Sequence, residues 1–133
     1  GEWFPDLCLF HLCSLESQRR VVDMVIQDGT KYDKILMIRP DVQFLGPFPM
    51  QIFLDRTPKK VFLPDHTSGE GYNDQLALFN ADEIAPYATR LYRAKHYRAT
   101  VGRIVGEKFL KYILDVNDYS VMLTDIPFHI LRE

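Results

Sequence analysis

The sequence predicts a single soluble α/β domain spanning residues 1–133. Helical periodicity at the start, short apolar runs in the middle, and helical patterns followed by a last apolar run together give an α/β order of elements. A chain of 133 residues is near the commonest domain length and can bury a core without disulfides. Its apolar share of 47% excludes a chain that is disordered throughout.

The first periodic segment, residues 6–28, predicts one long helix or two abutting helices. Apolar residues recur mostly three or four positions apart, and charged residues fill the other side. Pro5 suits the start of a helix, and Gly29 suits the position that ends one.

Four short apolar segments follow. Residues 34–39 are almost continuously apolar, which predicts a strand covered on both faces, in the middle of a parallel or mixed sheet. Pro40 interrupts that strand, and residues 42–45 resume an extended chain. Residues 61–63 and 76–79 predict a buried strand and a further strand.

The last third of the chain returns to helical patterns. Asn80 is suited to cap a helix that continues toward Arg93, although Pro86 leaves a later start as an alternative. Residues 101–115 predict a second helix, residues 119–123 a strand, and residues 128–131 one more candidate strand.

Composition limits the partners and the compartment. The net charge of −2 gives no reason to expect nucleic acid, and no apolar run approaches the roughly 18 residues of a membrane span. Cys8 and Cys13 fit neither a redox pair nor a zinc site, so we expect buried thiols in a reducing compartment. A cytoplasmic location is therefore expected, or a Golgi or membrane-associated one if the parent chain is longer.

Residues 90–111 carry seven basic side chains and a single acidic one. Such a run is typical of a solvated helical face. The alternative is a local positive field over an anionic ligand such as a diphosphate.

Two polar segments stand at the ends of apolar strands, Arg39-Pro40-Asp41 and residues 65–74. Open α/β sheets bind ligands in the crevice beyond their strand ends. A carboxylate held there suits an oxygen-preferring cation such as Mg or Mn. The alternative for Asp41 is a turn in which it accepts hydrogen bonds from Arg39 or from the backbone.

Several segments resemble a group of glycosyltransferase-like proteins with the GT-A fold, found in large viruses, plants and bacterial surface-polysaccharide loci. The resemblance begins with residues 32–44 (YDKILMIRPDVQF), which match an apolar strand followed by an RPD triplet. It continues through residues 61–65 (VFLPD), 71–79 (GYNDQLALF), 106–114 and 121–132, in the same order.

The resemblance implies a GT-A-like mixed, mostly parallel sheet flanked by helices. It also implies transfer of a sugar from a nucleotide-sugar donor to a hydroxyl on a glycan or glycoprotein acceptor, with Mn or Mg as cofactor. Carried over residue by residue, it assigns Asp74 and then Asp65 as the catalytic carboxylates. Asp41 and His129 become the metal ligands, and the substrate-binding residues are Arg39, Asn73, Tyr72 and His66.

The sequence departs from this pattern in two places. Arg39 stands where the group usually has the first Asp of its Asp-x-Asp triplet, and the chain begins with a helix rather than the first nucleotide-binding βα unit. Both departures favour an alternative function, a non-catalytic carbohydrate-binding or scaffold domain that keeps the fold.

Overall fold

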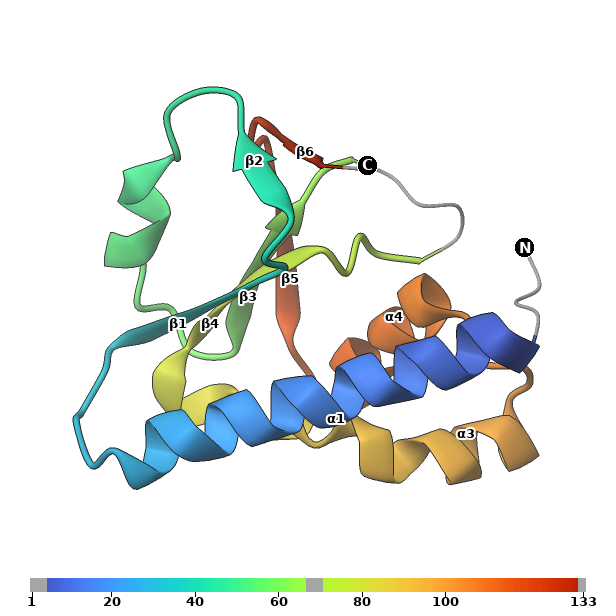
Figure 1. The fold of residues 1–133 in the computed structure, drawn as a ribbon. Coiled ribbons are helices and arrows are strands. Elements are labelled where there is room, and N and C mark those ends of the chain that lie inside the picture. Colours follow the sequence, from blue (N-terminus) through green and yellow to red (C-terminus); the bar gives the residue numbers. More distant parts are fainter. Residues whose placement is uncertain (1–4, 67–70, 132–133) are drawn as a thin grey trace.

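A four-stranded mixed sheet forms the centre of the computed structural model, which describes residues 5–66 and 71–131 (Figure 1). The strands lie side by side in the order β1 (Lys34–Ile38), β4 (Leu76–Asn80), β3 (Lys60–Pro64) and β5 (Ser120–Thr124). The chain is thus an α/β domain with a mixed sheet, as expected.

The expectation of a mostly parallel sheet is wrong. In the described part of the chain β4 runs antiparallel to both β1 and β3, and only β3 and β5 are parallel. The expected central place of residues 34–39 is also wrong, because β1 is an edge strand and Ile38 is 46% exposed. The strand that is buried along its whole length is β4.

A two-stranded antiparallel ribbon stands beside the main sheet. It pairs β2 (Val42–Phe44) with β6 (Phe128–Ile130), which confirms the extended chain expected in both places. The ribbon and the short helix η1 (Met50–Leu54) cover one face of the sheet, where η1 packs on Phe62 and Leu78 and the ribbon packs on Leu76.

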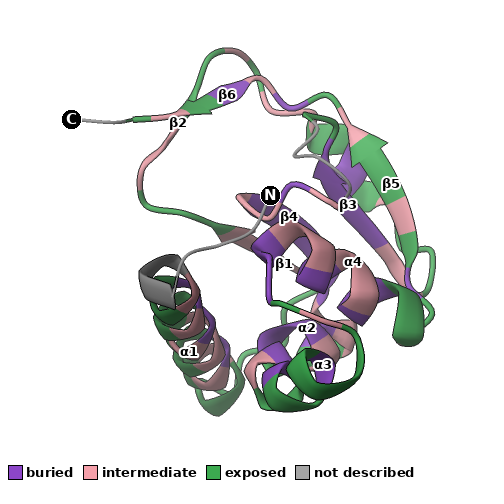
Figure 2. Ribbon diagram, turned by 90° about the vertical axis from the view of Figure 1, so that its right-hand side faces the viewer, coloured by how far each residue is buried: buried purple, intermediate pink, exposed green. Residues whose placement is uncertain are grey.

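The predicted first helix is confirmed as one continuous element, α1 (Pro5–Gln27). Gly29 follows it with φ 77°, a left-handed conformation that glycine adopts without steric cost. Among residues 8–27 the buried side chains of the helix are His11, Leu15 and Val22, so α1 is anchored by a narrow stripe (Figure 2).

The helix predicted from Asn80 is wrong in its details. The chain instead forms the short pieces η2 (Ala81–Glu83), α2 (Ala85–Ala88), η3 (Arg90–Arg93) and α3 (Ala94–Thr100). The Asn80 side chain caps none of them, because its oxygen accepts from the Lys34 ammonium at 2.7 Å and its amide donates to the Thr57 carbonyl at 3.0 Å. The last helix, α4 (Gly106–Val116), begins five residues later than expected, after Gly102 with φ 155°.

The second face of the sheet packs against α1, α2 and α4. Phe79 of β4 lies at the centre of this core, 4.6 Å from the Tyr87 ring and 5.7 Å from the Tyr119 ring between centroids. A second apolar cluster joins α1, α3 and α4 through Leu15, Tyr97 and Phe109. These contacts fix α1 beside β1, where the candidate site lies.

Candidate functional site

Polar residues from four strands gather at one end of the sheet. Strand register places them there, because Ile38 pairs with Leu76 and Pro64 pairs with Thr124. We call this group the polar sheet end; its members are Arg39, Asp65, His66, Asp74, Gln75 and Asp125. The antiparallel strand β4 therefore contributes the residues that precede it, and the other three strands contribute the residues that follow them.

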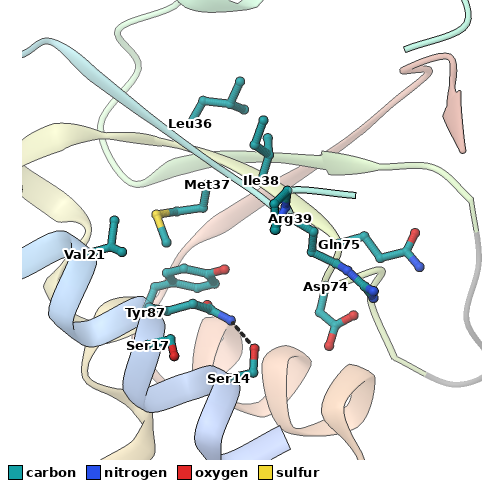
Figure 3. A pocket seen from close by; sticks show the side chains of 12 residues that line it. Ser14, Ser17, Val21, Leu36, Met37, Ile38, Arg39, Asp74, Gln75 and Tyr87 are labelled. Atoms are coloured by element: carbon teal, nitrogen blue, oxygen red, sulfur yellow. Dashed lines mark hydrogen bonds between the residues drawn. The ribbon is translucent and has the colours of Figure 1, made fainter. Parts of the chain in front are cut away.

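A cavity of about 290 Å³ opens at this end between α1 and the free edge of β1 (Figure 3). Met37 lies on the opposite face of the strand from Leu36 and Ile38, so a cavity that touches all three must run along the strand edge. On the helix side, the small side chains of α1 leave room for it. Its lining comprises Ser14, Ser17, Gln18, Val21, Leu36, Met37, Ile38, Arg39, Pro40, Asp74, Gln75 and Tyr87.

Asp74 is the acidic residue that lines the cavity, and Figure 3 shows it near the end of the Arg39 side chain. Burial raises the pKa of this carboxyl group, and the neighbouring Glu107 raises it further. Arg90 and Arg39 act in the opposite direction. A carboxylate with a raised pKa is a better proton acceptor, which is the property that a general base needs near neutral pH.

The turn that carries Asp74 is fixed by close packing against α4. The Tyr72 amide donates to the Glu107 carbonyl at 3.1 Å. A Cβ atom on Gly71 would lie 2.5 Å from the Lys108 backbone nitrogen, so only glycine fits there. The Asn73 side-chain oxygen accepts the Gln75 amide at 2.9 Å and thereby shapes the entry into β4.

Asn73 and Tyr72 therefore have structural contacts of their own. Asn73 is only 5% exposed, and neither residue lines the cavity. The Tyr72 ring lies 5.4 Å from the Lys111 ammonium and packs against the main core. Their assignment to substrate binding stays a prediction.

Arg39 and Asp41 form a bidentate ion pair in the turn that follows β1. The Arg39 guanidinium donates to the two Asp41 carboxylate oxygens at 2.9 and 2.6 Å. This is the hydrogen-bonded turn that the sequence left open as the alternative to a metal ligand. His129 is exposed in β6 and pairs in register with Gln43 of β2. A cation bound by Asp41 would have to displace the guanidinium, so this residue fits the expected metal poorly as it stands.

A different group of metal-ligating side chains lies at the polar sheet end. One ligand atom from each of Asp65, His66 and Asp125 lies within 4.8 Å of the other two. The sequence interpretation named Asp65 and His66 but missed Asp125. A signal was present, because residues 61–65 (VFLPD) and 121–125 (VMLTD) share the pattern V-x-L-x-D.

Arg90 was also missed as a buried residue. It is 2% exposed, and its guanidinium donates to the Tyr87 carbonyl and to Gln18, both at 2.9 Å. Gln18 in turn donates to Ser14 at 3.2 Å, so the contacts of Arg90 reach the wall of the cavity. Further along the basic run, Arg93, Lys95, Arg98 and Arg103 are exposed, as a solvated face predicts.

Part of the polar loop, residues 67–70, lies outside the described residues. No helix in the described ranges is long and apolar enough to cross a membrane. Comparisons with protein families, with curated proteins and with solved structures find no match to this chain.

Proposed function

We propose that the polar sheet end is the acceptor side of a nucleotide-sugar-dependent glycosyltransferase site, with Asp74 as general base. The observation that carries the proposal is the position of Asp74, a carboxyl group of raised pKa in the wall of a cavity. Such a cavity with a perturbed acid is the usual setting of a catalytic site. The acceptor would be a glycan or glycoprotein.

In the proposed step the acceptor hydroxyl gives its proton to Asp74 as its oxygen bonds to the anomeric carbon of the donor sugar. The bond from that carbon to the nucleoside diphosphate breaks, and the electron pair leaves on the diphosphate oxygen. A bound Mn or Mg ion would supply positive charge to that leaving group. The raised pKa favours proton transfer to Asp74, provided that the carboxyl group is ionised before the acceptor binds.

The walls of the cavity support a sugar as the occupant. Val21 and Met37 offer apolar surface to the face of a pyranose ring, and Ser14, Ser17 and Gln75 bring hydrogen-bonding groups to the lining. Ligand sites commonly combine apolar walls with a few polar groups that fix orientation. A volume of about 290 Å³ is close to the lower end of known ligand pockets, which favours one sugar unit over a longer chain.

A second candidate function is carbohydrate binding without catalysis. The Arg39–Asp41 pair favours it, because the carboxylate expected to hold the metal is already neutralised by a guanidinium. On that alternative the cavity binds a sugar, and Asp74 has no chemical role.

Release of nucleoside diphosphate from a panel of nucleotide sugars, measured with simple glycan and peptide acceptors, separates the two candidates. The catalytic proposal predicts release that Asp74→Asn abolishes and that Asp82→Asn, a change at an exposed carboxylate of η2, leaves at the level of the parent protein. No release from any donor, together with sugar binding that persists in both variants, would establish the second candidate instead.

A further inference from the structure

The two carboxylates at the ends of β3 and β5 occupy equivalent positions. The two strands are parallel and in register from Lys60 opposite Ser120 to Pro64 opposite Thr124. Asp65 and Asp125 are the next residues of each strand, and the Asp65 amide continues the ladder to the Thr124 carbonyl at 3.0 Å. Neighbouring strands lie about 4.8 Å apart, so the repeated V-x-L-x-D pattern brings two negative charges together.

Like charges placed directly across neighbouring strands destabilise a sheet. Within residues 5–66 and 71–131 no lysine or arginine forms an ion pair with Asp65 or Asp125. The nearest group that can carry a positive charge is the His66 imidazole, whose Nε2 lies 3.8 Å from the Asp65 carboxylate. The paired carboxylates therefore present a negative centre that a cation would neutralise.

The third side chain makes the group more than an acidic patch. His66 packs its ring on Phe128, with centroids 5.1 Å apart and planes inclined by 36°. This contact supports the imidazole beside the carboxylates, although the His66 side chain stays 43% exposed to solvent. Two carboxylate oxygens and one imidazole nitrogen suit a first-row divalent ion such as Mn²⁺, whereas Ca²⁺ and Mg²⁺ take mainly oxygen ligands.

We infer that Asp65, His66 and Asp125 form a binding site for a divalent transition-metal ion, with Mn²⁺ as its probe. Three protein ligands leave the remaining positions of the ion open to water or to oxygens of a ligand. Asp65 follows β3 and Asp74 precedes β4, and these strands are neighbours, so the ion would lie at the same sheet end as the proposed base. The inference goes beyond the proposed function, since metal binding here requires no sugar transfer.

Electron paramagnetic resonance tests the site directly, because the six-line signal of free Mn²⁺ disappears as the ion binds. We expect one ion per chain, and we expect each variant to weaken binding by about tenfold or more, because His66→Ala removes a ligand and Asp65→Asn and Asp125→Asn each replace an anionic ligand by a neutral one. Asp125 is exposed, so Asp125→Asn removes a charge with little loss of packing and should leave the circular dichroism spectrum unchanged.

Two control variants define the location. Asp82→Asn and Asp41→Asn should both bind Mn²⁺ as the parent protein does, and bound Mn²⁺ should broaden the amide resonances of residues 65, 66 and 124–126. The inference would be overturned if Asp125→Asn and Asp65→Asn bound Mn²⁺ with the affinity of the parent protein, or if Asp41→Asn lost binding. It would also be overturned if the parent protein bound no Mn²⁺ at millimolar concentration. None of these readouts depends on turnover, so the proposed function can fail while the metal site stands.

Discussion

Gly71 offers a sharp test of how the site is built, because its hydrogen faces the backbone of α4. A Cβ atom added there would lie 2.5 Å from the Lys108 nitrogen and closer still to the carbonyl group of Glu107. Helix backbone cannot yield as a flexible side chain does. Gly71→Ala must therefore push the turn that carries Asp74 away from α4.

The expected cost follows from the contacts that this shift breaks. Overpacking of one methyl group in a tight place costs about 1–3 kcal/mol. Separation of the Tyr72 amide from the Glu107 carbonyl removes one backbone hydrogen bond, which is about 1 kcal/mol more. We expect Gly71→Ala to lower the free energy of unfolding by about 2–4 kcal/mol, measured by urea denaturation.

Gly46→Ala is the matched control. The nearest atom to an added Cβ is the Pro127 Cγ at 3.3 Å, which belongs to a half-buried side chain just before β6 rather than to helix backbone. Its cost should stay within about 1 kcal/mol. If Gly71→Ala were as stable as Gly46→Ala, the close packing of this turn on α4 would be refuted.

Three further predictions concern pH and backbone strain. The raised pKa of Asp74 means that the folded protein holds the proton more tightly, so ionisation costs stability as pH rises above the unfolded value of 3.8. Asp74→Asn should therefore be more stable than the parent at pH 7, with a gain that vanishes in acid unfolding titrations below about pH 4. Burial, aided by Arg90, lowers the pKa of His11 from 6.5 to about 4, so stability should fall by up to about 3 kcal/mol as pH drops through that window. His11→Leu should reduce this loss of stability at acid pH, and a loss as large as that of the parent protein would contradict the lowered pKa of His11. Asp118 has φ 60°, so Asp118→Gly should raise the thermal midpoint and stabilise the fold by about 0.5 kcal/mol or more, whereas a lower midpoint would show that no strain is relieved.

The strands could be located from the sequence, but their neighbours could not. The apolar run of residues 34–39 predicts burial of both faces, and both faces are partly covered, since the half-buried Ile35 and Leu36 pack on opposite sides of the sheet. The pattern contains no information about the strand edges, because hydrogen bonds to a neighbour involve only the backbone. The sequence pattern therefore could not predict that β1 is an edge strand.

The residues of the candidate site could likewise be selected from the sequence, but their arrangement in space could not. Arg39, Asp65 and Asp74 could be selected because each stands at the end of an apolar segment. Their meeting with Asp125 depends on the pairing of β3 with β5 across 60 residues of chain, which no local pattern encodes. Asn80 failed as a predicted cap for a related reason, since the distant Lys34 and Thr57 engage its side chain.

The pH dependence of sugar transfer by the parent protein and by Asp74→Asn tests the central claim most directly. With a donor and acceptor that support turnover, the rate of the parent should rise with pH through the raised pKa of Asp74 and then level off. Asp74→Asn should no longer show this rise with pH, and its rate should be lower by about a hundredfold or more. It should still bind nucleoside diphosphate as the parent does. Transfer by Asp74→Asn at the parent rate and with the parent pH profile would contradict the assignment of Asp74 as the base.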